Sequence, residues 1–160
     1  MTKTAAPRDA PEVRHFVEQL ALSLVKMGFP PMPARVWAFM ISHEADTVTP
    51  GEISAHLEVS PAAVSGALRY LVQMGLTSRV VGVPGSRRQH YQVTADMWAD
   101  AFIARQSALT EFSDIIEGGI EILGADSEAG QRVAEIRDFF QYIAEELPRL
   151  LEEWRAKRKS

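Results

Sequence analysis

Two short groups of residues near the middle of the chain have the side-chain types and spacing that contact with a nucleic acid requires. Ser65 and Arg69 are four positions apart, so a helix would place a hydroxyl and a guanidinium on one face, where both can donate hydrogen bonds to phosphates or base edges. The second group, Arg87-Arg88, follows the turn sequence Pro84-Gly85-Ser86. Two guanidinium groups on a narrow projection can enter a minor groove or hold phosphates. Taken alone, each group is also compatible with ordinary surface charge.

The charge distribution favours the nucleic-acid interpretation. The whole chain carries a net charge of −4, but residues 59–95 contain no aspartate or glutamate. This segment has four arginines, at positions 69, 79, 87 and 88, so its net charge is +4 and the rest of the chain carries −8. A basic segment in an acidic protein is typical of a localised surface that contacts DNA. The alternative is a chance gap between acidic residues on a solvated surface.

The elements predicted around Ser65 and Arg69 form a helix-turn-helix. Thr49-Pro50-Gly51-Glu52 is a capping box that begins a short helix, which ends before the turn Glu58-Val59-Ser60. The next helix has Ser60 as its N-cap and ends at Gly75. Helical spacing assigns its buried face to Val64, Ala67, Leu68, Leu71 and Val72. Its outward residues are then Ala62, Ala63, Ser65, Gly66, Arg69 and Tyr70.

The outward face of this helix suits the major groove, because small residues at positions 62, 63 and 66 allow its backbone to approach the bases. A β-hairpin is predicted next, from the extended segments Thr77–Val83 and Arg88–Val93. His90 in the second segment adds a pH-sensitive group that can contact phosphate. The predicted DNA-binding residues are therefore Ser60, Ala62, Ala63, Ser65, Gly66, Arg69, Tyr70, Arg87, Arg88 and His90.

Together with an apolar helix predicted from Pro33 to about His43, these elements form a winged helix-turn-helix DNA-binding domain at residues 33–93. The fold class is mainly α with a small β-hairpin wing, and helices flank the winged helix on both sides. The first is Pro11–Gly28. After the wing, a long helix should begin at Thr94 or Ala95, weaken at Gly118-Gly119 and end near Gly124. A last helix should span about Ser127 to Arg158, with a kink or break just before Pro148.

The flanking helices carry apolar stripes that the winged helix does not need, because its core is complete within Pro33–Val93. Apolar stripes without a cover predict a partner chain. Regions 11–28 and 95–158 are therefore predicted to form a twofold homodimer, which would place the two recognition helices about 34–36 Å apart, at successive major grooves. The alternative is that these helices fold back on their own lobe.

Several classes of function lack the residues that they need. The chain has no cysteine, and its four histidines (15, 43, 56 and 90) are scattered without metal-ligand spacing. No catalytic constellation and no phosphate-binding loop is evident, so we expect neither an enzyme nor a cofactor. Without a signal peptide or a transmembrane run, the expectation is a cytoplasmic protein that does not bind membranes.

A pocket for a small-molecule effector is a weaker prediction. Trp37, Met40, Trp98 and Phe102 are the candidate wall residues, and an aromatic wall could hold a cationic ligand by cation–π attraction. Aromatic residues at helical spacing more often belong to the hydrophobic core, and that interpretation stays open.

Three segments resemble the GbsR branch of the MarR superfamily: Gly28–Val36, Val59–Leu71 and Val83–Arg88. The resemblance extends from Val13 to Trp154, and its most specific part is Ser60–Leu71. It implies a homodimer joined by the N- and C-terminal helices, with two winged-helix lobes on a pseudo-palindromic operator. It also implies that Ser60–Gln73 is the recognition helix, that Arg87-Arg88 lies in the wing, and that the protein commonly represses a nearby gene and responds to a small molecule.

Two other classes of function remain as alternatives. A winged helix can serve as a protein–protein interaction module without binding DNA, although the acid-free segment 59–95 speaks against this. A small metal-dependent enzyme is disfavoured by the absence of ligand spacing. The sequence specifies neither the operator nor the regulated gene nor the effector.

Overall fold

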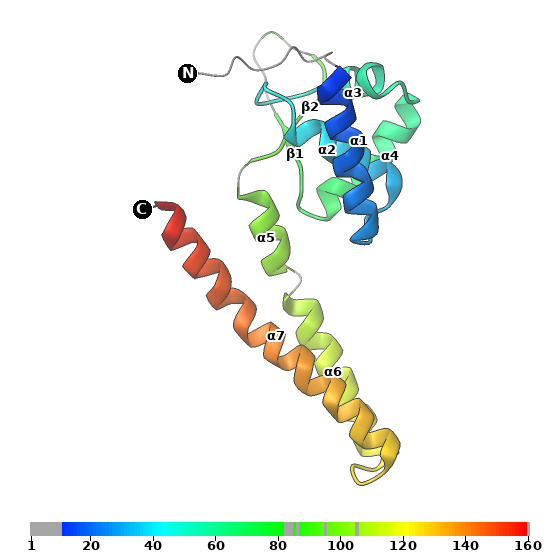
Figure 1. Ribbon diagram of the computed structural model, residues 1–160, viewed down its shortest axis with the longest axis vertical. Helices are drawn as coiled ribbons and strands as arrows, with labels where there is room; N and C mark the ends of the chain where they lie inside the picture. The colour runs from blue at the N-terminus through cyan, green and yellow to red at the C-terminus, as the bar shows by residue number, and fades with distance from the viewer. Residues whose placement is uncertain (1–10, 82–84, 86, 95, 105, 160) are drawn as a thin grey trace. The chain divides into compact units, whose positions relative to one another are not determined.

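The computed structural model describes residues 11–81, 85, 87–94, 96–104 and 106–159. The chain divides into two compact units, the first ending at Met97 and the second beginning at Trp98. Among the described residues, the first unit contains helices α1–α4 and strands β1 and β2 (Figure 1). The second contains α6, α7 and nearly all of α5.

Helix α1 (Pro11–Lys26) packs against α2 (Pro31–Ile41) within the first unit, and its residues Val17, Ala21 and Leu24 are buried. The helix ends at Lys26, two residues before the predicted end at Gly28, whose φ of +95° favours glycine. The N–H groups of Gly28 and Phe29 donate to the carbonyls of Val25 and Leu24 at 2.9 and 3.1 Å, which satisfies two carbonyls of the last turn.

Helix α2 begins two residues earlier than Pro33, because Pro30 takes the N-cap position and Pro31 the first helical position. It ends at Ile41 rather than His43. The prediction of a centrally buried helix is confirmed for most of its apolar residues, although Ile41 is 41% exposed. The buried residues are Pro33, Ala34, Val36, Ala38, Phe39 and Met40.

The helix-turn-helix is confirmed in α3 (Pro50–Leu57) and α4 (Pro61–Gln73). Thr49 and Glu52 form the predicted capping box: the Thr49 side chain accepts from the Glu52 N–H at 3.3 Å, and Glu52 Oε2 accepts from the Thr49 N–H at 2.8 Å. On α4, Val64, Ala67, Leu68 and Leu71 are buried as expected. Val72 is 43% exposed, so its assignment to the buried face was wrong. It lies at the edge of that face, beyond the buried residues of α4.

The wing pairs β1 (Ser78–Val80) with β2 (His90–Gln92) in an antiparallel sheet, with Arg79 opposite Tyr91. Both strands are shorter than the predicted segments, and Val83, Pro84 and Ser86 lie outside the described residues. No local pattern predicts a third partner for these strands. Val48, just before α3, exchanges backbone hydrogen bonds of 2.8 and 2.9 Å with Tyr91, so the root of the wing is tied to the helix-turn-helix.

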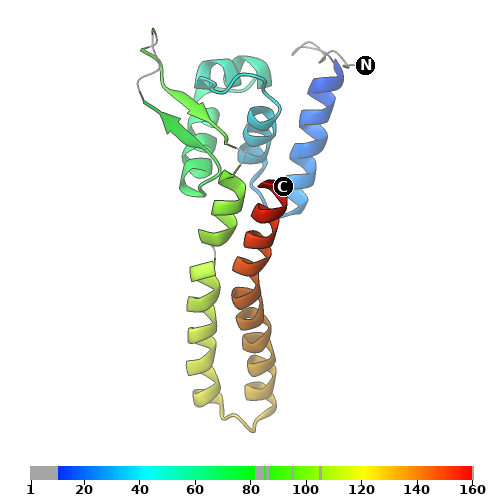
Figure 2. The same ribbon diagram turned by 90° about the vertical axis from the view of Figure 1, so that its left-hand side faces the viewer.

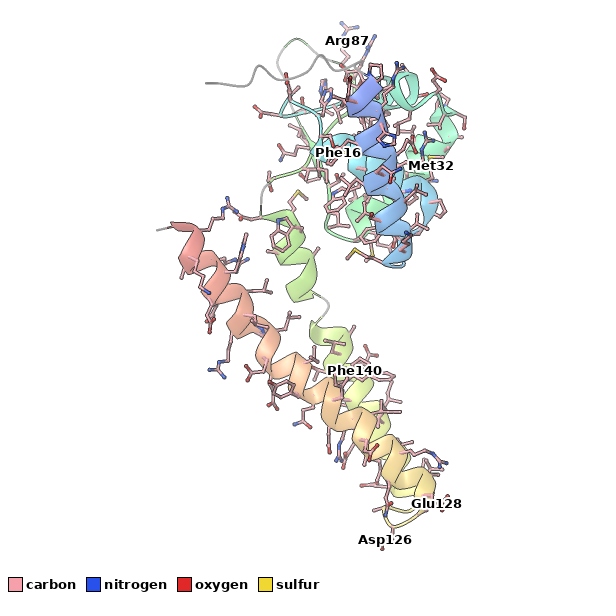
Figure 3. All side chains as sticks on the ribbon, viewed as in Figure 1. Phe16, Met32, Arg87, Asp126, Glu128 and Phe140 are labelled. Carbon is pink, nitrogen blue, oxygen red and sulfur yellow. The ribbon has the colours of Figure 1, made fainter. Side chains whose placement is uncertain are left out.

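In the second unit, α6 (Gln106–Leu123) and α7 (Glu128–Lys159) pack side by side as an antiparallel hairpin (Figures 1 and 2). Phe140 of α7 meets Phe112 of α6 edge-on, with ring centroids 4.8 Å apart (Figure 3). At the connecting turn, a Cβ on Gly130 would lie 2.1 Å from the Gly124 carbonyl oxygen. Only glycine fits there, which lets the connecting turn lie against the first turn of α7.

The predicted long helix corresponds to α5 (Met97–Ala104) and α6, and Arg105 between them lies outside the described residues. Gly118 and Gly119 lie inside α6 without a break, since a glycine weakens a helix but removes no hydrogen bond, and packing on α7 offsets the cost. Pro148 lies inside α7, which runs as one helix to Lys159, so the break that was one of the two predicted outcomes does not occur. Packing of this 32-residue helix along α6 offsets the missing donor.

None of the helices that the structure describes combines the length and the apolar character that crossing a bilayer requires.

Replacing Glu52 with Gln tests the cap that begins α3. Hydrogen bonds from the Thr49 backbone and side chain hold the pKa of the Glu52 carboxyl below its usual value of 4.5. The charged carboxylate therefore stabilises the folded state above pH 4.5, and this contribution is lost as the pH falls through the lowered pKa. At pH 7 we expect Glu52→Gln to reduce the free energy of unfolding by about 0.5–1 kcal/mol, as for other charges at helix N-termini.

The measurement is urea denaturation of both proteins at pH 7 and again well below pH 4.5. The difference between them should shrink at the lower pH. Glu44→Gln, at an exposed position between α2 and α3, is the matched control. A difference of the same size at both pH values would contradict the role of the carboxylate charge.

Candidate nucleic-acid interface

The N-terminal half of α4 presents a surface of small and polar side chains. Ser60 caps the helix, its hydroxyl accepting from the Ala63 N–H at 3.2 Å, and Pro61 occupies the first turn. Because the opposite face is buried, the six predicted outward residues all lie away from the core. Ala62, Ser65 and Arg69 are exposed, and Ala63, Gly66 and Tyr70 are partly exposed.

The Arg69 side chain extends back along α4 toward its N-terminus. A Cβ built on Gly66 would lie 3.9 Å from Arg69 Nη2, so the guanidinium lies close to the Gly66 backbone on the same face. No acidic residue occurs in the first turn of α4. The positive end of the helix dipole therefore lies beside an exposed guanidinium, an arrangement that attracts phosphate.

The turn between α3 and α4 is held by hydrogen bonds from Ser54, which sequence reasoning missed. The Ser54 hydroxyl donates to the Val59 carbonyl at 2.6 Å, and the Ser54 carbonyl accepts from the Val59 N–H at 3.2 Å. Between them, Glu58 adopts a left-handed conformation with φ +53°, where glycine would be the ordinary residue. This turn fixes the angle at which α4 leaves α3.

Arg79 in the wing has a structural partner. Its Nη2 donates to the Tyr91 hydroxyl at 3.4 Å, and its guanidinium lies over the Tyr91 ring, 5.8 Å from the centroid. The Tyr91 hydroxyl in turn donates to Gln89 Oε1 at 3.3 Å. Sequence reasoning counted Arg79 only in the charge of the segment. Because Arg79 lies opposite Tyr91 in the strand pairing, its side chain lies across the Tyr91 ring on the hairpin.

The other wing residues differ in exposure. Arg87 and Arg88 are exposed and lie outside the strands, and Figure 3 shows Arg87 at the outer end of the hairpin. His90, the first residue of β2, is partly buried, with Nδ1 3.3 Å from the Thr47 hydroxyl. The arrangement brings two arginines to the tip and places the histidine nearer the core.

Three of the four predicted pocket residues take part in the packing of their own unit. Trp37 stacks on Phe29 and donates from Nε1 to the Leu76 carbonyl at 3.1 Å, while the Met40 sulfur is buried and accepts from Thr77 Oγ1 at 3.5 Å. In the second unit, the rings of Trp98 and Trp154 meet edge-on at 4.8 Å. The side chain of Phe102 lies outside the described residues.

Two histidines of the first unit border the core. His43 and His56 both pack on the Phe39 ring, with centroid distances of 5.1 and 4.6 Å. Across the part of the chain that the structure describes, no group of three or more histidine, cysteine, aspartate or glutamate side chains is placed to hold a metal ion.

The comparisons with known proteins agree with this geometry. Residues 27–89 match the model of the MarR family, and residues 96–157 match the model of MmpR5-like MarR family transcriptional regulators. The HTH-type transcriptional regulator MmpR5 of Mycobacterium tuberculosis is 25% identical over 134 residues, which cover 83% of this chain and 81% of that protein.

Among solved structures, the crystal structure of a transcriptional regulator has a TM-score of 0.78 at 22% identity, covering 91% of this chain and 99% of that one. A MepR–DNA complex from S. aureus has a TM-score of 0.42 at 20% identity, covering 82% and 93%. The first of these shares the fold. Two MarR-type family models therefore match successive parts of the chain, so the chain is similar to the MarR family of winged-helix transcriptional regulators along most of its length.

Proposed function

We propose that this regulator is a homodimeric repressor that binds a pseudo-palindromic operator. Each protomer inserts α4 into a major groove, and Arg87 and Arg88 of the wing contact the minor groove or the flanking phosphates. The observation that carries the proposal is the outer face of α4, where small side chains surround Ser65 and Arg69 and where the first turn contains no acidic group.

The geometry of α4 supports contact with base edges. A helix enters the major groove with its N-terminal residues closest to the bases. Ala62, Ala63 and Gly66 add little bulk there, so the backbone can come near the groove floor. Ser65 and Arg69 can then donate to bases or phosphates, with Ser60 and Tyr70 at the borders of the same surface.

The wing supports a contact with the sugar–phosphate backbone. Its two strands are held by the β1–β2 pairing and by the bridge from Val48 to Tyr91, so the hairpin is anchored at its base. Arg87 and Arg88 are exposed at the other end. His90, which begins β2 and is partly buried, would reach DNA only at the margin of the interface.

The dimer proposal rests on apolar side chains that the chain leaves exposed. On α6 and α7, Ile115 is 68% exposed, Ile122 86% and Phe139 58%. Phe112, Ile115 and Ile122 recur at helical spacing, as do Ile136, Phe139 and Leu150. The inner residues of α1 are buried against α2, as the alternative in which this helix folds back on its own lobe requires. Three other apolar residues of this region stay exposed: Phe16, Leu22 and Met27. A twofold partner would cover both sets.

Repression and its release by a small-molecule effector are typical of the family and form part of the proposal. Trp98, which is 36% exposed beside Trp154, is the predicted pocket residue most available to such a ligand. The likeness of Ser60–Leu71 to the GbsR branch stays a prediction, since the models that match are those of the MarR family and of its MmpR5-like members.

The proposal is tested by selection of bound fragments from genomic DNA, followed by titration of a recovered duplex. A recovered site with two related half-sites about one helical turn apart supports the dimeric arrangement. Failure to recover any sequence, with only weak binding to all duplexes, would instead favour a winged-helix module that contacts other proteins.

Gly66→Ala separates a role in DNA contact from a role in folding. The space around Gly66 admits a methyl group at an ordinary contact distance from Arg69. Alanine is also the better helix former, so we expect the free energy of unfolding to rise by about 0.5–1 kcal/mol. If the backbone at position 66 approaches the bases, affinity for the recovered duplex should nevertheless fall, by about tenfold as for a contact worth 1–3 kcal/mol.

Affinity is measured by fluorescence anisotropy and stability by urea denaturation. Gly51→Ala in α3, where a Cβ would lie 4.0 Å from Thr49 Oγ1, is the matched control and should leave DNA binding unchanged. Unchanged DNA affinity in Gly66→Ala would contradict the close approach of α4.

The double variant Arg87→Ala/Arg88→Ala tests the wing. Each phosphate contact that is lost lowers the dependence of affinity on salt, so the slope of log K against log salt should flatten by up to ~2 units. Affinity should fall to a similar degree for specific and random duplexes, because phosphate contacts carry no sequence information. Arg132→Ala/Lys157→Ala on α7 makes the same change in charge and serves as the control. A slope equal to that of the wild type would remove the wing from the interface.

Ile115→Glu tests the dimer. This side chain is 68% exposed on α6, so glutamate should leave the helices of one protomer intact. A buried, unpaired carboxylate in an interface is costly, and we expect the variant to be a helical monomer at concentrations at which the wild type is a dimer. Sedimentation equilibrium gives the mass, and Gln131→Glu on the exposed surface of α7 is the control. A dimeric variant, or a monomeric wild type, would contradict the proposed interface.

A further inference from the structure

Arg35 joins three helices of the first unit through one guanidinium group. From α2, its Nε donates to both carboxylate oxygens of Glu18 on α1 at 3.0 Å, and its Nη2 donates to Glu18 Oε1 at 2.5 Å. Nη2 also donates to the carbonyl of Leu57 at 3.5 Å. Arg35 and Glu18 are 17 positions apart, and both side chains are partly buried.

The contact with Leu57 is placed where a helix needs a donor. Leu57 is the last residue of α3, and the carbonyls of a last helical turn lack donors within their own helix. This end of the helix also carries a negative partial charge, so a guanidinium there is favourable. The planar fork of arginine can donate to a carboxylate and a carbonyl at once, which the single ammonium of lysine does less well.

The same contact lies at the start of the turn that leads to α4. Only Glu58, Val59 and Ser60 separate Leu57 from the first residue of α4. Val59 is bound to Ser54 through both its N–H and its carbonyl, and Ser60 caps α4. A shift of the Leu57 peptide would therefore be passed to α4 through a short, hydrogen-bonded turn.

We propose that Arg35 is a positioning residue for DNA recognition, which fixes the orientation of α4 relative to α1. The inference rests on the proposed function, in which α1 contributes to the dimer and α4 lies in the groove. In such a dimer, the angle between α1 and α4 decides whether both recognition helices meet their half-sites in register. Base contacts depend on that register more strongly than phosphate contacts do.

The experiment compares Arg35→Met, Glu18→Gln and the double variant with the wild type. Methionine keeps an apolar stem and removes every donor, and glutamine keeps the shape of Glu18 without its charge. Arg14→Met, at an exposed position on α1, is the matched control. The probes are a duplex that the wild type recovers from genomic DNA and a random-sequence duplex of the same length. Each is titrated at two salt concentrations, at a temperature below the Tm of every variant.

We expect Arg35→Met to lower the affinity for the recovered duplex by about three- to thirtyfold, the range for coupled contacts, with a much smaller effect on the random duplex. The dependence on salt should stay that of the wild type, because no phosphate contact is removed. Glu18→Gln should act in the same direction, and the double variant should bind no more weakly than Arg35→Met, since Glu18 acts through Arg35.

Equal losses for both duplexes, a flatter salt dependence, additive effects of the two substitutions or an unchanged affinity would each overturn the inference. If Arg35→Met fails to fold, Arg35→Lys replaces it in the same comparison. Its affinity for the recovered duplex should be lower than that of the wild type and no lower than that of the double variant Glu18→Gln/Arg35→Lys. A wild type that recovers no duplex refutes the proposed function, whereas a wild type that recovers one and is matched by its variants refutes only the role of Arg35.

Discussion

The burial of one face of α4 is the constraint on which the DNA-binding unit depends. Val64, Leu68 and Leu71 are almost wholly buried, and α2 and α3 pack on this face. Because an α-helix repeats every 3.6 residues, fixing these positions also fixes which residues point outward. The core of the unit and its recognition surface are therefore two sides of one packing arrangement, so a change that rotated α4 to improve one would disturb the other.

Signals that lie close together in the sequence predicted most of the first unit. The capping box at Thr49 and Glu52, the serine cap of α4 and the glycine that ends α1 act over three or four residues, and the structure contains all three. The outward set on α4 followed from the same periodicity. The exposed arginines at 69, 87 and 88 could thus be singled out as candidate contacts before the fold was known.

Features that depend on distant residues could not be predicted in this way. The bridge between Val48 and Tyr91 joins segments 43 positions apart, and the Arg35–Glu18 pair also requires the packing of two helices. Local rules failed at Gly118, Gly119 and Pro148, where the pairing of α6 with α7 outweighs weak helix propensity. Val72, at 43% exposure, lies at the edge of the buried face set by Val64, Leu68 and Leu71.

The Val48–Tyr91 bridge separates how the wing is held from what the wing contacts. Its two hydrogen bonds are made by main-chain atoms, which every residue except proline supplies. Substitutions at Arg87 or Arg88 therefore leave the attachment of the hairpin untouched. Over evolutionary time, related regulators could acquire new preferences for the DNA beside their half-sites by changing the tip alone, while the inherited scaffold kept it in place.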